Sequence, residues 1–140
     1  ITIINFIWLF FISNQHKKRM IDSQIIKIAS DTSNYGIKRK SDFIATSKNK
    51  NCGDKITIEL EVINKVIKRM NYETESCIFC QASASLLSKL IRYNNINKLS
   101  SFLEIAKKNK KFKKIFKNKE RISCTMLPFK TLQKFVNYTL

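Results

Sequence analysis

The sequence contains few of the residues on which several common kinds of functional site depend. Its 140 residues include one histidine, two glycines and one proline. The histidine, His16, precedes the first segment that we predict to be structured, so histidine-based nucleophilic or acid–base catalysis is not expected in the folded part of the chain. The glycines, Gly36 and Gly53, are too few and too far apart for a phosphate-binding glycine-rich loop.

Acidic residues are also scarce, because 10 Asp and Glu stand against 27 Lys and Arg, which gives a formal net charge of +17. A charge of this size is typical of proteins that bind nucleic acids or anionic membranes. The excess is carried mainly by lysine, and abundant Lys, Ile and Asn are the composition expected from an AT-rich genome. The charge alone therefore favours an ordinary solvated lysine surface, and a basic nucleic-acid-binding module remains an alternative.

The sequence has no apolar run long enough to cross a bilayer, which takes about 20 residues. The run ITIINFIWLFFI at residues 1–12 is too short, and its basic cluster HKKR follows the run, unlike in a signal peptide. Met20 stands directly before a predicted helix. We therefore expect residues 1–19 to be a non-native or disordered leader and residues 20–140 to form a single domain. A short membrane-associating segment is the alternative for the leader.

The four cysteines, Cys52, Cys77, Cys80 and Cys124, are interpreted as reduced thiols. Nothing in the sequence resembles a cleavable signal peptide, and a chain of this length folds without disulfide bonds. We therefore expect a cytoplasmic protein with no membrane partner.

Hydrophobic periodicity predicts an α+β domain. Residues 55–63 alternate apolar and polar side chains, with Glu59 and Glu61 on the predicted wet face, and Asn64 and Lys65 form a tight turn into a second strand at 66–75. Residues 42–48 form a short third strand. A helix is expected before this sheet, at the apolar positions Ile25, Ile26, Ile28 and Ala29.

Three further helical regions follow the hairpin. The first begins after Cys77, with a face formed by Ala82, Ser85, Leu86, Lys89, Leu90 and Tyr93. The second covers about residues 96–108. In the lysine-rich run after it, Phe112 and Phe116 have the spacing of core residues, although they could instead stack on nucleic-acid bases. A terminal helix begins after Cys124, with Pro128 in its opening turn.

The hairpin brings two of the thiols together. Because the start of its first strand and the end of its second lie side by side, Cys52 and Cys77 are expected to meet, with Asp54 on the same side as Cys52. Cys124 joins them if the terminal helix docks at this edge. Cys77 and Cys124 both stand next to helix starts, which favours lowered thiol pKa values. Thiolates are required for soft-metal binding and for sulfur transfer.

Three segments of the sequence resemble one known family. CGDKITIELEV, SCIFCQASASLL and RISCTMLPFKTLQKFV are similar to the signature segments of the NifU N-terminal, IscU and SufU family of iron–sulfur cluster scaffold proteins. The resemblance extends from Asn34 to the end of the chain. It implies a three-stranded antiparallel sheet packed against several helices. It also implies that Cys52, Cys77 and Cys124 hold a transient 2Fe-2S or 4Fe-4S cluster, or zinc in some members, and that Asp54 joins this site and keeps the cluster labile.

The resemblance further implies a cysteine desulfurase and apo iron–sulfur recipient proteins as partners. We expect a scaffold and not a turnover enzyme, with Cys124 as the persulfide acceptor because it lies on a late segment expected to be mobile. Ser123 replaces the histidine of the IscU branch, and the long insertion of classical SufU is absent. The branch therefore stays open, with a zinc-bound sulfurtransferase that relays persulfide as the alternative to a scaffold.

Cys80, one helical turn after Cys77, has three interpretations. It is a half-buried free thiol, an auxiliary metal ligand, or the redox partner of Cys77. A two-cysteine zinc clip is excluded because the sequence contains no matching second pair.

Overall fold

The computed structural model describes residues 23–137 of the chain. Strands β1 (Phe43–Lys48), β2 (Lys55–Ile63) and β3 (Val66–Glu75) form an antiparallel three-stranded sheet in the order β1-β2-β3. The expected sheet is therefore confirmed. The predicted leader at residues 1–19 lies outside the described residues. Within the described part, no helix is both long enough and apolar enough to cross a membrane.

The hairpin between β2 and β3 has the predicted turn. Asn64 and Lys65 both have positive φ values, 51° and 64°, as a two-residue hairpin turn requires. The register runs from Ile63 opposite Val66 at the turn to Lys55 opposite Glu75 at the open end. The segments just before β2 and just after β3 are therefore neighbours.

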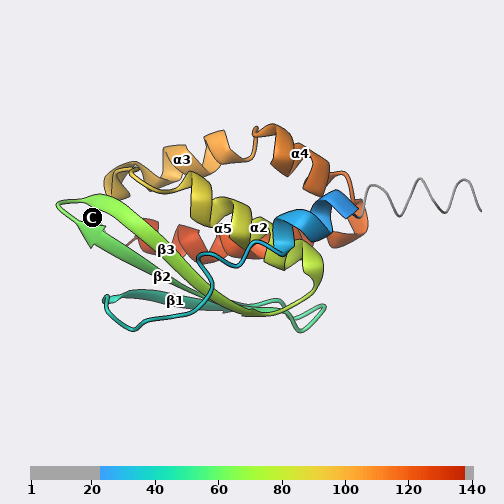
Figure 1. The fold of residues 1–140 in the computed structure, drawn as a ribbon, viewed down its shortest axis with the longest axis horizontal. Helices are drawn as coiled ribbons and strands as arrows, with labels where there is room; N and C mark the ends of the chain where they lie inside the picture. The colour runs from blue at the N-terminus through green and yellow to red at the C-terminus, as the bar shows by residue number, and fades with distance from the viewer. Residues whose placement is uncertain (1–22, 138–140) are drawn as a thin grey trace, which may run out of the picture.

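Helices cover one face of this sheet (Figure 1). Residues 23–29 are helical and are followed, after the sheet, by α2 (Ile78–Leu90), α3 (Leu99–Ala106), α4 (Lys110–Phe116) and α5 (Ile122–Val136). Short 3₁₀ turns at Ile96–Lys98 and Lys119–Arg121 lead into α3 and α5. Helix α5 packs on β1 and β2, and α2 packs on β3 and α5. Helices α3 and α4 form an outer layer on the far side of α2 and α5.

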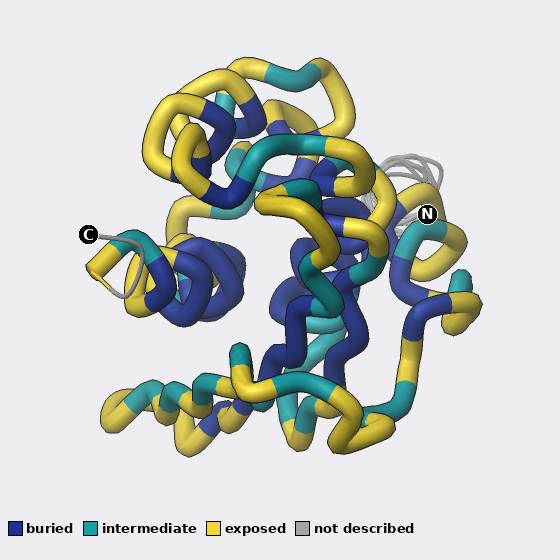
Figure 2. The backbone as a smooth tube through the Cα atoms, turned by 90° about the vertical axis from the view of Figure 1, so that its left-hand side faces the viewer, coloured by how far each residue is buried: buried dark blue, intermediate teal, exposed yellow. Residues whose placement is uncertain are grey.

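The core lies between the sheet and these helices, as the buried stretches in Figure 2 show. Phe112 is fully buried, and its ring contacts those of Phe116 and Phe129 at centroid distances of 5.9 and 5.0 Å. The core interpretation of Phe112 and Phe116 is therefore confirmed over base stacking.

The predicted one-sided face of α2 is wrong. Residues 82–88 are all buried, whereas Lys89 and Tyr93 are exposed. The helix contacts β3, α4 and α5, so it is covered on nearly every side. Its alternating Ala and Ser side chains are small enough for these neighbours to approach closely.

The predicted wet face of β2 is also wrong at Glu59, which is fully buried. Residues 38–41 fold over this face of the sheet and donate backbone N–H groups to the Glu59 carboxylate. At this position the polar face of β2 is therefore buried and hydrogen-bonded instead of facing solvent.

The terminal helix begins earlier than predicted. Because α5 begins at Ile122, Cys124 lies within its first turn and Pro128 lies in the second turn, not in the first. Pro128 has no N–H to donate to the carbonyl oxygen of Cys124, four residues earlier. The expected mobile position of Cys124 is not what the structure shows, because this residue is buried in a regular helix.

Candidate metal centre

The loop between β1 and β2 carries two of the predicted site residues. The Asn49 N–H donates to the Asp54 carbonyl oxygen at 2.7 Å, and the Gly53 N–H donates to the Asn49 carbonyl oxygen at 2.8 Å. Gly53 has a φ of 75°, a left-handed conformation that glycine adopts without strain. This tight loop leaves Cys52 exposed at its tip and turns Asp54 into the protein, where only 6% of the residue is exposed.

Helix α5 brings Cys124 to the same place. The Cys52 Sγ and Cys124 Sγ atoms are 3.4 Å apart although 72 residues separate them in sequence. Ligand atoms of Cys52, Asp54 and Cys124 all lie within 4.8 Å of one another. Two sulfurs and a carboxylate oxygen therefore converge at the end of the sheet where the hairpin opens.

Cys77 lies beside this group and is joined to it through Asp54. It occupies the N-cap position of α2, and its backbone N–H donates to Asp54 Oδ1 at 3.2 Å. Its half-buried thiol is close enough to contribute to the raised pKa of Cys124, but it is not one of the three ligands within 4.8 Å. The structure thus brings the four predicted residues to one edge, with three donor atoms close together.

The second carboxylate oxygen of Asp54 is buried and has no hydrogen-bond partner among the described residues. A buried anionic oxygen without a donor is unfavourable, because water no longer solvates it. A cation held between this oxygen and the two sulfurs would compensate its charge. The donor set therefore fits a metal ion or an iron–sulfur cluster.

The pKa of the Cys124 thiol is raised well above its usual range. Burial is the main cause, and the neighbouring Cys52, Asp54 and Cys77 side chains add to it. The predicted lowering by the helix start is therefore wrong for Cys124, because loss of solvent and nearby acidic groups outweigh the partial charge of the helix. A metal that binds here displaces the proton from this thiol.

Cys80 points into the core instead of joining the group. It is fully buried, its Sγ lies 3.9 Å from Thr74 Oγ1, and burial raises its pKa to about 11. Of the three interpretations, the structure favours a free buried thiol.

Sequence reasoning missed the residues that hold the first turn of α5 against α2. The Ser83 hydroxyl donates to the Thr125 carbonyl oxygen at 2.7 Å, and the Thr125 hydroxyl donates to the Arg121 carbonyl oxygen at 3.1 Å. Both Ser83 and Thr125 are buried. The small residues of the ASAS segment signalled a close helix contact, but their hydrogen-bond partners could not be read from the sequence.

Comparisons with known proteins agree with this geometry. The model of the NifU-like N terminal domain family matches residues 20–139. The iron–sulfur cluster assembly scaffold protein IscU of Thermotoga maritima is 28% identical over 131 residues, which cover 84% of this chain and 92% of that protein.

Two solved structures have the same fold. One is the N-terminal part of a nitrogen-fixing NifU-like protein from Brucella abortus, with a TM-score of 0.67 and 19% identity over 83% of this chain and 93% of that one. The other, from Fervidobacterium islandicum AW-1, is described as an iron–sulfur cluster assembly scaffold for the SUF system, with a TM-score of 0.63 and 19% identity over 78% and 90% of the two chains. Because the family match at residues 20–139 includes every described residue, the chain belongs to the NifU-like N terminal domain family of iron–sulfur cluster assembly scaffold proteins.

Proposed function

We propose that this protein is a scaffold that accepts sulfur and iron, assembles a labile iron–sulfur cluster and passes it to apo-proteins. Cys52, Asp54, Cys77 and Cys124 would hold the cluster. The observation that supports this most strongly is the convergence of the Cys52, Asp54 and Cys124 ligand atoms within 4.8 Å. They lie beside a buried Asp54 oxygen to which residues 23–137 donate no hydrogen bond.

The donor set suits both assembly and release. Thiolates are the usual ligands of iron–sulfur clusters, whereas a carboxylate oxygen is a harder ligand that binds cluster iron less strongly. Because Cys52 is exposed, the site is open to solvent on one side. A cluster held by several thiolates and one carboxylate at a protein edge is therefore retained but remains accessible to a recipient.

Sulfur would arrive as the persulfide of a cysteine desulfurase. An acceptor thiolate attacks the outer persulfide sulfur, the S–S bond of the donor breaks, and the donor cysteine leaves as a thiolate. Cys124 is buried and Cys52 is exposed, so we assign the first transfer to Cys52 and the second, over the 3.4 Å between their sulfurs, to Cys124. An external reductant supplies the two electrons that convert this sulfur to sulfide.

A zinc-bound sulfurtransferase is the second candidate. Zinc in proteins takes tetrahedral sets of thiolate and carboxylate ligands, in which two sulfurs lie about 3.7 Å apart. The 3.4 Å between Cys52 Sγ and Cys124 Sγ is close to this separation.

Anaerobic reconstitution with ferrous iron, cysteine and a cysteine desulfurase distinguishes the two candidates. We expect a thiolate-to-iron absorption band that is lost in Cys52→Ala and in Cys124→Ala. Cys80→Ala is the matched control, because it also removes one thiol but leaves the three converging ligands in place. Tight stoichiometric zinc with no cluster would favour the sulfurtransferase, and equal cluster yields in all variants would refute the proposed site.

A further inference from the structure

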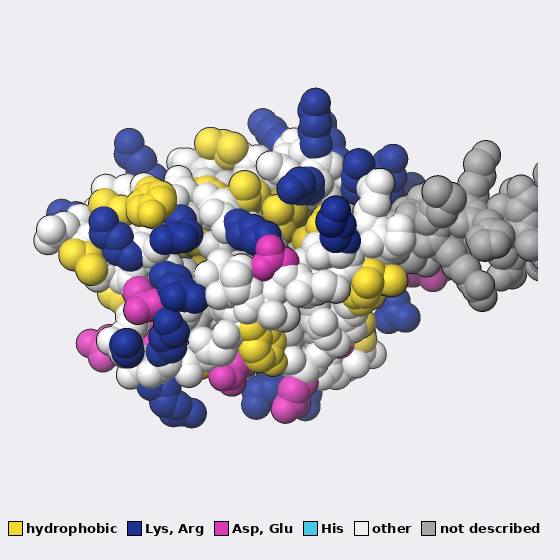
Figure 3. Space-filling view, viewed as in Figure 1, with side chains coloured by type: hydrophobic (Ala, Val, Ile, Leu, Met, Phe, Trp, Pro, Cys, Tyr) yellow, Lys and Arg dark blue, Asp and Glu magenta, His cyan; other side chains and the backbone are white. Residues whose placement is uncertain are grey.

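A pocket of about 410 Å³ lies between the helix of residues 23–29, α2 and α4. Ile28 and Leu86 supply apolar side chains to its lining. Four lysines from these elements also line it: Lys27, Lys89, Lys111 and Lys114. Figure 3 shows Lys and Arg side chains gathered over this part of the molecule, around exposed apolar surface. We call this hollow the lysine pocket.

The charges of the lysine pocket are poorly compensated. Asp31 is the one carboxylate that lines it, and it pairs with Lys89. Lys114 Nζ donates to the neutral Gln24 Oε1 at 3.2 Å. Among the described residues, Lys27, Lys111 and Lys114 have no carboxylate partner. Three positive charges therefore face one cavity without a carboxylate partner of their own, and they repel one another.

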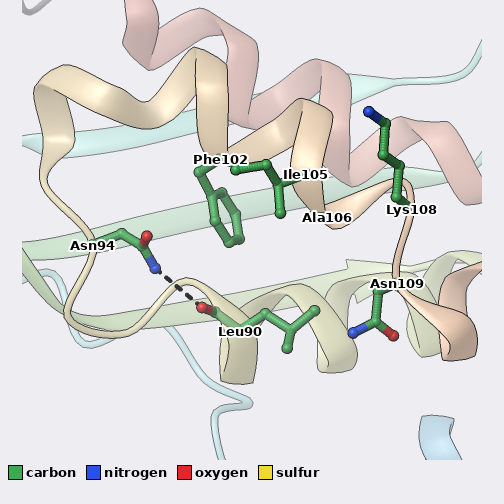
Figure 4. Close-up of a pocket in the computed structure, with 7 residues that line it drawn as sticks. All are labelled: Leu90, Asn94, Phe102, Ile105, Ala106, Lys108 and Asn109. Atoms are coloured by element: carbon green, nitrogen blue, oxygen red, sulfur yellow. Dashed lines mark hydrogen bonds between the residues drawn. The ribbon is translucent and has the colours of Figure 1, made fainter.

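Lysine abundance alone does not account for this arrangement. A second pocket, between the end of α2 and α3, is lined by Leu90, Phe102 and Ile105 but by a single lysine, Lys108 (Figure 4). A third pocket, on the sheet, has one lysine and two glutamates. The lysine pocket thus concentrates positive charge more than either of these two pockets.

The chemistry of the lining favours carboxylates over phosphates. The pocket contains no arginine, whose planar fork suits phosphate, and no glycine-rich backbone that could donate several N–H groups. Half-buried Ile28 and buried Leu86 both line the pocket. An apolar side chain of a ligand therefore finds a complementary surface there. An acidic segment with one large apolar residue matches both features.

We propose that the lysine pocket binds an acidic segment of a partner protein, anchored by an apolar side chain. This inference rests on the proposed function, in which a sulfur donor or a cluster recipient must dock near the thiols. Ser85 and Lys89 line the pocket on α2, the helix that begins directly after Cys77. At about 1.5 Å per residue they lie roughly 12 to 18 Å along the axis from Cys77. A partner that buries about 800 Å² of this surface is large enough to cover both the lysine pocket and the thiols.

The test is a binding titration with a synthetic peptide of Asp and Glu residues around one leucine, carried out with the whole protein. We expect Lys111→Glu/Lys114→Glu to weaken binding by about tenfold, because two attractive charges become repulsive. The matched control is Lys98→Glu/Lys130→Glu, which changes net charge equally at two exposed lysines outside the pocket. Circular dichroism verifies that both variants fold.

Two further probes sharpen the result. Replacing the peptide leucine by serine is expected to weaken binding to the natural protein severalfold, since the apolar base loses its contact. A single-stranded oligonucleotide is expected to bind with no dependence on which lysine pair is changed. The proposal would be overturned if both variants lost the same affinity for the peptide. It would also be overturned if the oligonucleotide bound more tightly than the peptide and lost its affinity in Lys111→Glu/Lys114→Glu. Chemical reconstitution of the cluster from ferrous iron and inorganic sulfide, without a desulfurase, is expected to be unchanged in the same variants. A failure of the docking site and a failure of the scaffold function are therefore separable.

Discussion

Two buried carboxylates, Asp54 just before β2 and Glu59 in its middle, differ in how their charge is satisfied. Glu59 is fully buried, and its oxygens accept bonds of 2.8 to 3.3 Å from three backbone N–H groups and one side-chain amide: Lys38, Lys40, Ser41 and Asn71. Asp54 accepts one backbone N–H, that of Cys77, and its second oxygen has no donor in the described part of the chain.

This difference separates a carboxylate that holds the fold from one that, under the proposed function, binds a ligand. Buried charges are normally paired or fully hydrogen-bonded, because desolvation is otherwise too unfavourable. Glu59 meets that rule with protein donors alone and fixes the chain segment that crosses the sheet. Among residues 23–137, Asp54 has a backbone donor at one oxygen only, and a cation between its other oxygen and the thiols of Cys52 and Cys124 would compensate its charge.

The largest effect on stability is therefore expected from Glu59→Ala. The change leaves three backbone N–H groups of residues 38–41 facing an apolar side chain, and it should lower the free energy of unfolding by about 3 kcal/mol or more. Urea unfolding followed by circular dichroism measures this loss.

Asp54→Ala is the matched control for that experiment. It removes a buried carboxylate too, but one that accepts a single N–H bond, so the free energy of unfolding should change by about 1 kcal/mol or less. Equal losses in Glu59→Ala and Asp54→Ala would show that the two carboxylates do not differ in role.

The next largest effect is a dependence of stability on pH through Glu59. Burial raises the pKa of this carboxyl, but hydrogen bonds from Lys38, Asn71, Ser41 and Lys40 together lower it below its ordinary value of 4.5. A group with a lowered folded-state pKa stabilises the fold above its unfolded pKa and loses this contribution as the pH falls through the folded value. Glu59→Gln should therefore be less stable than the natural protein at neutral pH, and the gap should narrow below about pH 4.5. Urea midpoints across this range measure the gap, and a constant difference would contradict the assignment.

The sheet and half of the candidate site could be predicted because they depend on local patterns. The alternation along β2 and the two-residue turn determine the hairpin, and the hairpin places Cys52 and Cys77 near each other at its open end. The side of the strand on which each residue lies follows from the same alternation.

The remaining features depend on contacts between distant segments. Glu59 is buried only because residues 38–41 cross the sheet, and nothing periodic in that segment indicates where it crosses. The start of α5 was missed because residues 119–121 have the composition of the lysine-rich run before them. The raised pKa of Cys124 could not be predicted either, since it follows from burial beside three acidic neighbours.

A smaller effect is expected from Cys80→Ala. This variant tests whether the thiols, like the carboxylates, divide into one that only packs in the fold and others that bind a ligand. Cys80 is fully buried and outside the converging ligands, so the change should lower the free energy of unfolding by about 1 kcal/mol and leave cluster loading intact. Because burial raises its pKa to about 11, Cys80 should also be alkylated by iodoacetamide more slowly than the exposed Cys52. Peptide mass mapping over time gives the order, and loss of cluster loading in Cys80→Ala would assign it as a ligand.

The smallest effect is expected at a third carboxylate, Asp31, which is ion-paired and only partly buried. Its bonds with Lys89 and Ser33 lower its pKa from 3.8 to about 2, so its contribution is present above pH 3.8 and is lost as the pH falls toward 2. Solvent screens an exposed pair strongly, and Lys89→Met should shift the urea midpoint only slightly, by an amount that disappears at about 1 M salt. Lys89→Met could instead shift the urea midpoint as much as Glu59→Ala does, both at low salt and at about 1 M salt. Burial would then not be what distinguishes the carboxylates, and the contrast between Glu59 and Asp54 would lose its physical basis.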